Sequence, residues 1–520
     1  MEQRTTGFHG ALRGLDRTPR SARFEGRFGR LFRSLEPATF SRASLETLAK
    51  AMSADVEFGP DADAEDAEEN QGILAGYTYL GQFIDHDLTF DPASSLDRQN
   101  DPDALVDFRT PRFDLDCVYG RGPDDQPYLY RDDGIRMLLG RKLTGNPDDP
   151  SARDLPRNPA VAGEPSRALI GDPRNDENVI VSQLHAAFLR FHNRLVDVMP
   201  GAVFVDLQRL VRWHYQWVVL HDFLPTIVIK DVINDVLPHI VKKTDPATDP
   251  PKLTVFKKPK NNAFIPVEFS VAAYRFGHSM IRPFYRLNTT LPKPFSIFPV
   301  DTTGVPNGDI IEAGESLRGF REFPSPWAID WRLFFPQTGV KPVLAGATNR
   351  VQPAYKIDTS LVAPLTNLPD VPPPAMLALR NLLRGLQMGL PSGQAVAAFM
   401  GVHVLGDDHL VVGKATEEDS EKNPSVATLS PDFGGNAPLW FYILSEAQQQ
   451  FTKDSSPIRL GPVGGRIVAE TFVRLLLEDS QSFLNQAPRW KPFEAFRAAN
   501  GEFRMADLMK QARLAVDIQS

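Results

Sequence analysis

The segment Gly81–Asp87 reads Gly-Gln-Phe-Ile-Asp-His-Asp and places one imidazole between two carboxylates inside an apolar stretch. Apolar residues in and before it recur at spacings of four, three and four, which predicts one face of a helix: Ile73, Tyr77, Leu80 and Ile84. Gln82 and His86 then share a different face. Buried charges need partners or a metal, so the chain must fold around a polar site beside this helix. On the triplet alone, a structural histidine is favoured slightly over a catalytic one.

The composition bounds the class of protein. A hydrophobic fraction of 42% and a charged fraction of 23% over 520 residues are ordinary for a globular protein with a sizeable core. The 45 Pro and 36 Gly predict helices joined by many long, ordered loops. The formal net charge of -8 gives no basic field for nucleic acid. Cys117 is the single cysteine, so no internal disulfide framework forms, and we expect it to be a small buried residue.

The apolar runs of the sequence bear on its location. No run of about 18 apolar residues predicts a membrane span, and the start lacks the apolar stretch of a secretory signal. We therefore expect a cytoplasmic protein, with export without a signal left open. Residues 1–34 are rich in Arg and Gly, which favours an arm over the acidic body rather than a transit-like or anionic-surface segment. We divide the chain into an Arg-rich arm, residues 1–50, and one domain, residues 51–520.

Helical spacing and turn signals predict the remaining elements. Residues 45–52 form a short helix, residues 55–69 an acidic solvated loop, and residues 121–170 a long loop region. A helix carrying His185 and His192 begins near Asn175 or Asp176 and runs to Arg194, and these two histidines are expected to make structural hydrogen bonds. Further helices cover 207–224, ended by Pro225, and 266–283, which contains His278. Helices also lie near 377–386, 394–400, 438–449 and 466–477, and strands are few and short.

Oxygen-bearing side chains gather after the predicted central helix. Thr110, Asp114 and Asp116 come at close spacing before Val118-Tyr119-Gly120. Calcium prefers such ligands, but the glycine and terminal glutamate of an EF-hand are missing. A solvated turn is therefore favoured over a cation site on this evidence alone.

Three segments taken together resemble a known family. They are Gly81–Asp87, the run Arg174-Asn175-Asp176-Glu177, and the run Tyr274-Arg275-Phe276-Gly277-His278. In this order they resemble the animal-type haem peroxidases of the peroxidase-cyclooxygenase superfamily, and the length and loop pattern look most like the bacterial branch. The resemblance covers roughly residues 70–480. It implies a mainly α fold: one large helical domain with haem between a distal and a proximal helix, and many long loops.

The resemblance assigns the proximal side of the haem. His278 is expected to ligate the iron, and Asn381 matches the asparagine that accepts its second ring proton. A neutral amide fixes the tautomer of the ligand without pushing it toward imidazolate. Arg275 and Arg384 match arginines near the haem propionates, where a cation offsets a carboxylate.

The resemblance also assigns the distal side. His86 is expected to move a proton between the two oxygens of hydrogen peroxide. Arg174 would stabilise the charge that builds on the departing oxygen, and Gln82 matches a glutamine that hydrogen-bonds distal water or a halide. Together they imply a peroxidase that uses hydrogen peroxide and a small electron donor.

Two carboxylates and one departure from the family refine this expectation. Asp85 and Glu177 match the residues that form esters with haem methyl groups in mammalian members, so haem b is expected with or without such links. Position 178 is Asn, whereas the most strongly oxidising member has a methionine bonded to a haem vinyl group. Chloride oxidation is therefore in doubt, and bromide, iodide, thiocyanate or phenolic donors are expected.

The resemblance also turns the oxygen cluster into an expected calcium site. Its ligands would be Asp87, Thr110 through its side chain and carbonyl, the Arg112 carbonyl, Asp114 and Asp116. The position of Asp116 is usually serine in the family, so this site carries an extra negative charge. We expect stronger cation binding, coupled to His86 through its neighbour Asp87.

Two alternatives remain. A fatty-acid oxygenase of the same superfamily needs a tyrosine three residues before the proximal histidine, and this chain has Arg275 there, with Tyr274 one position further away. We rank it below the peroxidase. A non-catalytic haem-binding protein is also considered, although loss of His86 or Arg174 would have been expected of it, and both are present.

Overall fold

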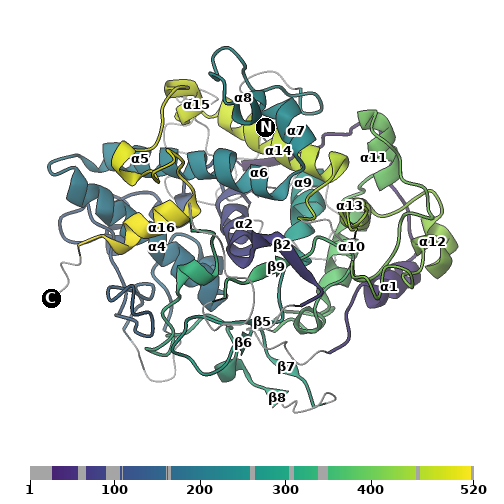
Figure 1. The fold of residues 1–520 in the computed structure, drawn as a ribbon, viewed down its shortest axis with the longest axis horizontal. Helices are drawn as coiled ribbons and strands as arrows, with labels where there is room; N and C mark the ends of the chain where they lie inside the picture. The colour runs from purple at the N-terminus through teal and green to yellow at the C-terminus, as the bar shows by residue number, and fades with distance from the viewer. Residues whose placement is uncertain are drawn as a thin grey trace, which may run out of the picture.

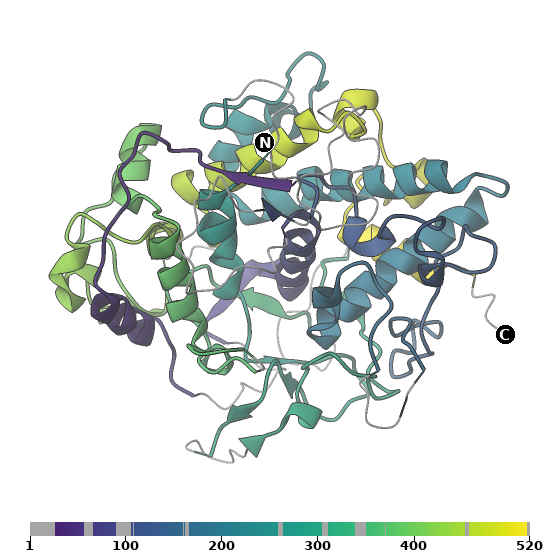
Figure 2. The same ribbon diagram turned by 180° about the vertical axis from the view of Figure 1, so that it is seen from behind.

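The computed structural model describes residues 26–56, 66–89, 106–107, 109–159, 161, 166–257, 264–303, 310–337, 350–369, 371–452 and 457–516. Residues 1–25 of the expected arm and 57–65 of the expected acidic loop lie outside these ranges. Within them the chain is mainly helical with a few short strands, as the sequence predicts. Figure 1 shows the helices gathered around a central helix, α2 (Ala75–Leu88), and Figure 2 shows the same helix in the middle from behind.

The other helices are α1 (Arg42–Ala51), α3 (Asp116–Tyr119), α4 (Val179–Val198), α5 (Phe204–Val218), α6 (Leu224–Ile227), α7 (Lys230–Val236), α8 (Pro238–Lys242), α9 (Val267–Val271), α10 (Leu377–Gln387), α11 (Gly393–Met400), α12 (Val426–Leu429), α13 (Leu439–Gln448), α14 (Pro462–Glu478), α15 (Phe483–Gln486) and α16 (Met505–Arg513). The predicted helices at 45–52, 377–386, 394–400, 438–449 and 466–477 are confirmed. Their ends differ by a few residues, which is the least certain part of any pattern-based prediction.

The strands form small separate sheets. β1 (Gly26–Gly29) lies between β3 (Val106–Asp107) and β4 (Ile265–Pro266), and β2 (Glu69–Leu74) pairs with β9 (Pro353–Tyr355). Two hairpins complete the set: β5 (Phe284–Tyr285) with β6 (Phe295–Ser296), and β7 (Val300–Asp301) with β8 (Ile310–Ile311). These short strands connect loops to the helices and do not form a separate sheet layer.

One continuous apolar cluster runs through the molecule and includes buried side chains from Phe28 to Ala512. The central helix contributes Phe83, which stacks on Phe188 of α4 with 4.6 Å between ring centroids. Phe32 and Leu45 of the expected arm are also buried in this cluster. Burial of apolar surface on this scale is the main term that stabilises the fold, and it fixes the position of α2.

The start of the central helix differs from the prediction. Ile73 lies in β2, because this strand pairs with β9 before α2 begins at Ala75. Glu69, expected in a solvated loop, is buried. It is stabilised there by ion pairs with Arg282, at 2.7 Å, and with Arg350. A buried charge requires such partners.

The helix expected to end at Pro225 continues past it. After α5, a π-helical turn, η6 (Val219–Phe223), leads directly into α6, and Pro225 stands in the first turn of α6. A proline is tolerated there because the N–H that it lacks has no partner within a first helical turn. The expectation that a proline ends the helix is wrong here, because a π turn directly before Pro225 continues into a further helical turn.

The helix expected over 266–283 is two helices. Ala272 leaves the helical region with φ of −126° and ψ of −73°, between α9 and a 3₁₀ helix, η7 (Ala273–His278). Arg275 Nε donates to the Ser270 carbonyl at 2.8 Å, which satisfies an acceptor at the end of α9. The break places His278 at the end of η7.

Candidate active site

His86 lies in the last turn of α2, and Asn175 holds one of its ring nitrogens. His86 Nδ1 is 2.8 Å from Asn175 Oδ1. An amide oxygen only accepts hydrogen bonds, so Nδ1 carries the proton and Nε2 keeps its lone pair. Asn175 Nδ2 lies 3.0 Å from His185 Nδ1 and donates to it. The histidine is thereby fixed in the tautomer whose Nε2 can accept a proton.

The surroundings of His86 keep it neutral. The residue is only 4% exposed. Burial, followed by the positive charge of Arg174, lowers the pKa of His86 from 6.5 to about 4. The ring is therefore in its basic form near neutral pH.

The other two histidines of this region have structural roles, as expected. His185 contacts Asn175, and His192 Nδ1 lies 3.0 Å from the Tyr119 hydroxyl. His192 Nε2 lies 2.8 Å from the Ile135 carbonyl. The helix that carries them, α4, begins three residues later than the predicted Asp176, because a 3₁₀ turn, η5 (Pro173–Asp176), precedes it.

Gln82 and Glu177 lie in front of His86 Nε2. Glu177 Oε1 is 3.9 Å from this nitrogen and accepts a hydrogen bond from Gln82 Nε2. Gln82 Oε1 accepts from Asn178 Nδ2 at 3.2 Å. Asn178 also caps α4, since its Oδ1 accepts from Ile180 N at 3.1 Å. Burial raises the pKa of Glu177 to about 7, against the opposing effect of the nearby Arg174 charge.

Arg174 extends from η5 to the end of the central helix. Its Nη2 donates to the Thr89 carbonyl at 2.6 Å and to the His86 carbonyl at 3.2 Å. The same Nη2 lies 2.8 Å from Asp172 Oδ2. Arg174 is thus brought beside His86, as the sequence predicts, and a buried carboxylate accompanies it.

The sequence also pairs His278 with Asn381, and the structure brings these two side chains together. His278 Nδ1 lies 2.8 Å from the side-chain amide of Asn381, which comes from α10. A half-turn of that amide places its oxygen at the same position, where it accepts the Nδ1 proton. The opposite ring nitrogen, Nε2, then keeps its lone pair. Burial, followed by the charge of Arg275, lowers the pKa of His278 to about 3, so the ring is neutral.

Space is open beside His278. A Cβ added to Gly277 would meet no atom within 4 Å in the described part of the chain. His278 itself is half-buried. The neutral imidazole, its amide partner and this open side are what a haem ligand requires, so the residues present fit a haem.

The distal and proximal elements are neighbours. The central helix packs on η7, and the Tyr274 hydroxyl donates to the Gly81 carbonyl at 3.2 Å. Asp85, half-buried on α2, accepts from Thr89 Oγ1 at 3.0 Å. Arg384 is half-buried on α10, about one turn beyond Asn381.

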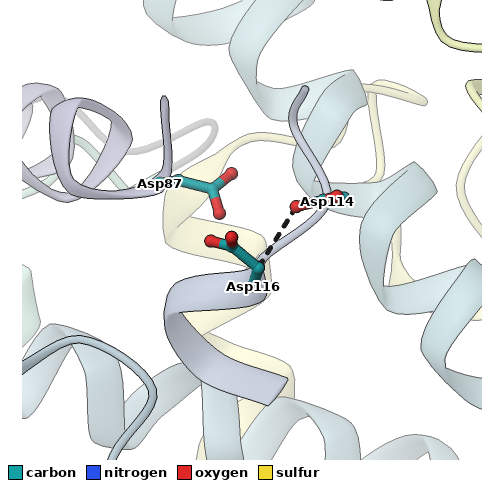
Figure 3. Close-up of side chains that lie close together, drawn as sticks. All are labelled: Asp87, Asp114 and Asp116. Carbon is teal, nitrogen blue, oxygen red and sulfur yellow. Dashed lines mark hydrogen bonds between the residues drawn. The ribbon is translucent and has the colours of Figure 1, made fainter. Parts of the chain in front are cut away.

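Three carboxylates meet where the central helix ends. Asp87, Asp114 and Asp116 form the carboxylate cluster, and each offers one oxygen within 4.8 Å of the others. Figure 3 shows the three side chains converging, with Asp116 N donating to Asp114 Oδ1 at 3.2 Å. Asp87 is fully buried, and its Oδ2 has no hydrogen-bond partner among the described residues. Burial and the charges of the other two carboxylates hold the pKa of Asp87 well above its usual range.

Thr110, another expected ligand residue, lies beside the cluster. Thr110 Oγ1 donates to Asp114 Oδ2 at 2.7 Å, and the Thr110 carbonyl accepts from Arg112 N at 2.7 Å. Cys117 is buried as expected, with Sγ 3.5 Å from Asp87 Oδ1. Arg109 compensates only Asp116 of these three carboxylates, and a hard cation is the partner that such an oxygen cluster suits.

Sequence reasoning missed three residues of the site: Asn175, Asp172 and Arg109. Asn175 lies in the run Arg174-Asn175-Asp176-Glu177, but the resemblance assigns it no role. Asp172 had a local signal, because an Asp before Pro173 is typical of a helix start, and its Oδ1 accepts from Arg174 N at 2.9 Å. Arg109 had no signal, since its contact with Asp172 spans 63 residues.

Comparison with known proteins defines the family. The model of the animal haem peroxidase family matches residues 93–408, which include Arg174, His278 and Asn381. The chain belongs to the animal haem peroxidase family, whose members are oxidoreductases acting on peroxide. Thyroid peroxidase of Sus scrofa is 28% identical over 313 residues, which cover 56% of this chain and 30% of that protein. The chain thus spans under a third of this curated relative.

Solved structures share the fold. Peroxidase A from Dictyostelium discoideum superposes with a TM-score of 0.54 at 15% identity, over 93% of this chain and 94% of that one. Oryza sativa fatty acid alpha-dioxygenase gives the same TM-score and identity, over 95% of this chain and 80% of that one. No helix in the described ranges is both long enough and apolar enough to cross a bilayer.

Proposed function

We propose that this chain is a haem-dependent peroxidase that reduces hydrogen peroxide and oxidises a small donor. One observation carries the proposal. Two neutral histidines, His86 and His278, stand on neighbouring elements, and each has Nδ1 held by an asparagine amide at 2.8 Å. The two Nε2 atoms are then available for two different tasks, one as a base and one as a metal ligand.

The haem would be held from the proximal side. His278 would ligate the iron, and Asn381 would fix the ring orientation. Arg275 and Arg384 would pair with the propionates. When bound, haem supplies the two-electron redox chemistry that no side chain offers.

The distal side chains would handle the proton and the charge of peroxide. His86 Nε2 would accept the proton of one peroxide oxygen and return it to the other, departing oxygen. Arg174, fixed by the Thr89 carbonyl and by Asp172, places a positive charge where negative charge develops. The departing oxygen would leave as water, and the donor would supply the two electrons that the overall reduction of peroxide requires.

The donor would be small and easily oxidised. Gln82 and Asn178 supply amide groups on the His86 side of the site. Such groups can hydrogen-bond bromide, iodide, thiocyanate or a phenol. Asn178 is committed to the cap of α4, and its side chain cannot form the methionine link expected of a chloride oxidiser.

Asp85 and Glu177 would be the two sites of haem esters. Both lie on the distal side, and the charge of Asp85 contributes to the raised pKa of Glu177. Mass analysis of acid-stripped holoprotein tests this idea. Haem that stays with the polypeptide supports the esters, and recovery of only free, unmodified haem would rule them out.

The carboxylate cluster would hold Ca²⁺. The buried Asp87 Oδ2 without a partner supports this, together with the oxygen-only ligand set of Asp114, Asp116, Thr110 and the Arg112 carbonyl.

The proposal is tested by absorption spectroscopy. Purified protein supplemented with haem receives one equivalent of hydrogen peroxide and then bromide or a phenol. A Soret band that shifts with peroxide and recovers with donor supports the peroxidase. A stable band that ignores peroxide indicates haem binding without catalysis, and the absence of a band contradicts the assignment of His278.

Tyr274 is the observation that favours a second candidate, a fatty-acid oxygenase. It lies against the distal helix, where a tyrosyl radical could form near the haem. Its hydroxyl is, however, occupied by the Gly81 carbonyl, and its register differs from the one expected of an oxygenase. An oxygen-uptake assay with a polyunsaturated fatty acid separates the two candidates, because only the oxygenase consumes O₂ with that substrate.

A further inference from the structure

Asp172 is a fully buried carboxylate between two arginines. Its exposed fraction is 0%. It accepts Arg174 Nε at 3.2 Å and Nη2 at 2.8 Å. It also accepts Arg109 Nε at 3.0 Å and Nη2 at 2.6 Å. Burial alone would raise the pKa of Asp172, but the hydrogen bond and charge of Arg174, and then the charge of Arg109, keep it well below its usual range.

These contacts determine the orientation of Arg174. A guanidinium is planar, so fixing its Nε and Nη2 edge against Asp172 also fixes where the opposite edge points. The contact of Nη2 with the Thr89 carbonyl locks the same group against the end of the central helix. The direction of the Arg174 charge is therefore set by Asp172 rather than by the long side chain itself.

Arg109 has a second carboxylate partner. Its Nη1 lies 3.2 Å from Asp116 Oδ1, and its side chain is only 10% exposed. Asp116 belongs to the carboxylate cluster. The contacts form a continuous path of charged side chains: Asp116, Arg109, Asp172 and Arg174.

We propose that Asp172 is a positioning residue for Arg174, and that Arg109 couples it to the carboxylate cluster. A divalent cation bound by the cluster would then strengthen the binding of an anion beside His86. The inference rests on the proposed function, because that function assigns Arg174 to peroxide chemistry.

The direction of the coupling follows from charge. Without a cation, Arg109 is shared between Asp116 and Asp172. A cation that binds Asp116 leaves more of the Arg109 charge for Asp172, and Asp172 then offsets less of the Arg174 charge. Arg174 becomes a stronger partner for an anionic ligand. By linkage, the anion strengthens cation binding by the same factor.

The positioning role is tested with Asp172→Asn and a matched control, Asp176→Asn. Asp176 is also buried, at 2% exposed, lies in η5, and accepts two hydrogen bonds of 2.7 Å, but from Arg157. In Asp172→Asn we expect the rate constant with peroxide and the cyanide affinity, read from the Soret band, to fall about 10- to 100-fold. The control should change both far less at similar thermal stability. If the rate constant and the cyanide affinity fell equally in both variants, the cause would be a general loss of packing around η5. That result would overturn the inference.

A double-mutant cycle asks whether Asp172 acts through Arg174. In an Arg174→Gln background, Asp172→Asn should cause no further loss of cyanide affinity. A full additional loss would contradict the assigned role. If Asp172→Asn does not fold, Asp172→Glu replaces it, because it keeps the charge but moves the carboxylate by one methylene and should cause a smaller loss of the same kind.

The coupling is tested by titrating Ca²⁺ into chelator-treated holoprotein. In the wild type, Ca²⁺ should raise the cyanide affinity, and in Arg109→Gln this response should disappear. Calorimetry on the haem-free protein gives an independent result: Arg109→Gln should bind Ca²⁺ about threefold to tenfold more tightly, since a competing charge is removed. An undiminished response in Arg109→Gln would show that the neighbours Asp87 and His86 transmit the effect instead. Absence of Ca²⁺ binding in the wild type would also overturn the coupling.

The outcomes separate this inference from the proposed function. Wild-type protein without a Soret band, or with one that ignores peroxide, contradicts the function and the inference with it. Wild-type protein that reacts with peroxide, together with Asp172→Asn that reacts equally fast, contradicts the inference alone.

Discussion

Asn175 joins two imidazoles through one amide, and this residue explains why His86 Nε2 keeps a lone pair that can accept a proton. Its oxygen takes the His86 Nδ1 proton and its nitrogen donates to His185. The side-chain amide of Asn381 pairs with His278 Nδ1 in the same way. In both cases a neutral amide selects the tautomer without adding charge to a buried site.

The two histidines are expected to fail in different ways when replaced. His278→Ala removes the ligand and should abolish the haem spectrum. His86→Ala should keep the Soret band but reduce the rate of reaction with peroxide by about 10²- to 10⁴-fold, because the base is lost. Stopped-flow absorption measures both. Normal peroxide reactivity in His86→Ala would contradict the assigned mechanism.

The predictability of the site differs from residue to residue. The resemblance names His86, Arg174, His278 and Asn381. The structure brings Arg174 to His86, Asn381 to His278, and the two elements that carry the histidines into contact. The contacts of Asp172 with Arg109 could not be foreseen, because helical periodicity carries no information about which side chains meet across loops. Such pairs depend on tertiary structure alone.

At the scale of elements, apolar spacing predicted most helices, and the errors have local causes. Ile73 fits the apolar spacing of the central helix although it lies in β2, because a buried strand and a buried helix turn show similar apolar runs. The continuation of α5 through Pro225 depends on a π turn, and the division of the 266–283 segment depends on the Ala272 conformation. Neither leaves a trace in residue spacing.

The carboxylate cluster joins the end of α2 to the start of α3, so cation removal should loosen both elements. At a Ca²⁺ concentration 100 times the dissociation constant, the free energy of unfolding should rise by about 2.7 kcal/mol relative to chelator. Thermal or urea unfolding with Ca²⁺ or with a chelator measures this. Asp114→Asn should lose most of the response. A stability that is the same with calcium and with chelator in the wild type would contradict a calcium site here.

At the scale of the whole molecule, a buried carboxyl between α13 and α14 makes stability depend on pH. Glu446 accepts hydrogen bonds from Val463 N at 3.0 Å and Gly464 N at 3.2 Å. Burial raises its pKa from 4.5 to about 7, against the effect of these bonds. The folded state therefore holds this proton more tightly than the unfolded chain. The stability it contributes is full below pH 4.5 and is lost as the pH rises through about 7.

This dependence is checked by comparing the wild type with Glu446→Gln, which cannot ionise but keeps one acceptor. The stability of the wild type relative to the variant should fall by at most about 3 kcal/mol between pH 4.5 and pH 7. Urea unfolding at several pH values gives the difference, and it cancels the titration of all other groups. Parallel curves for the two proteins would contradict the assignment.

The π turn has a consequence for how the chain assembles during synthesis. It places Asp222 where its Oδ1 accepts from the Tyr77 hydroxyl at 2.7 Å and its Oδ2 accepts from Met505 N at 2.8 Å. These contacts span 145 and 283 residues. A ribosome must therefore deliver the segment that becomes α16 before both carboxylate oxygens of Asp222 have these partners. Since distant contacts form slowly, we expect Asp222 to join the central helix and α16 only late in folding.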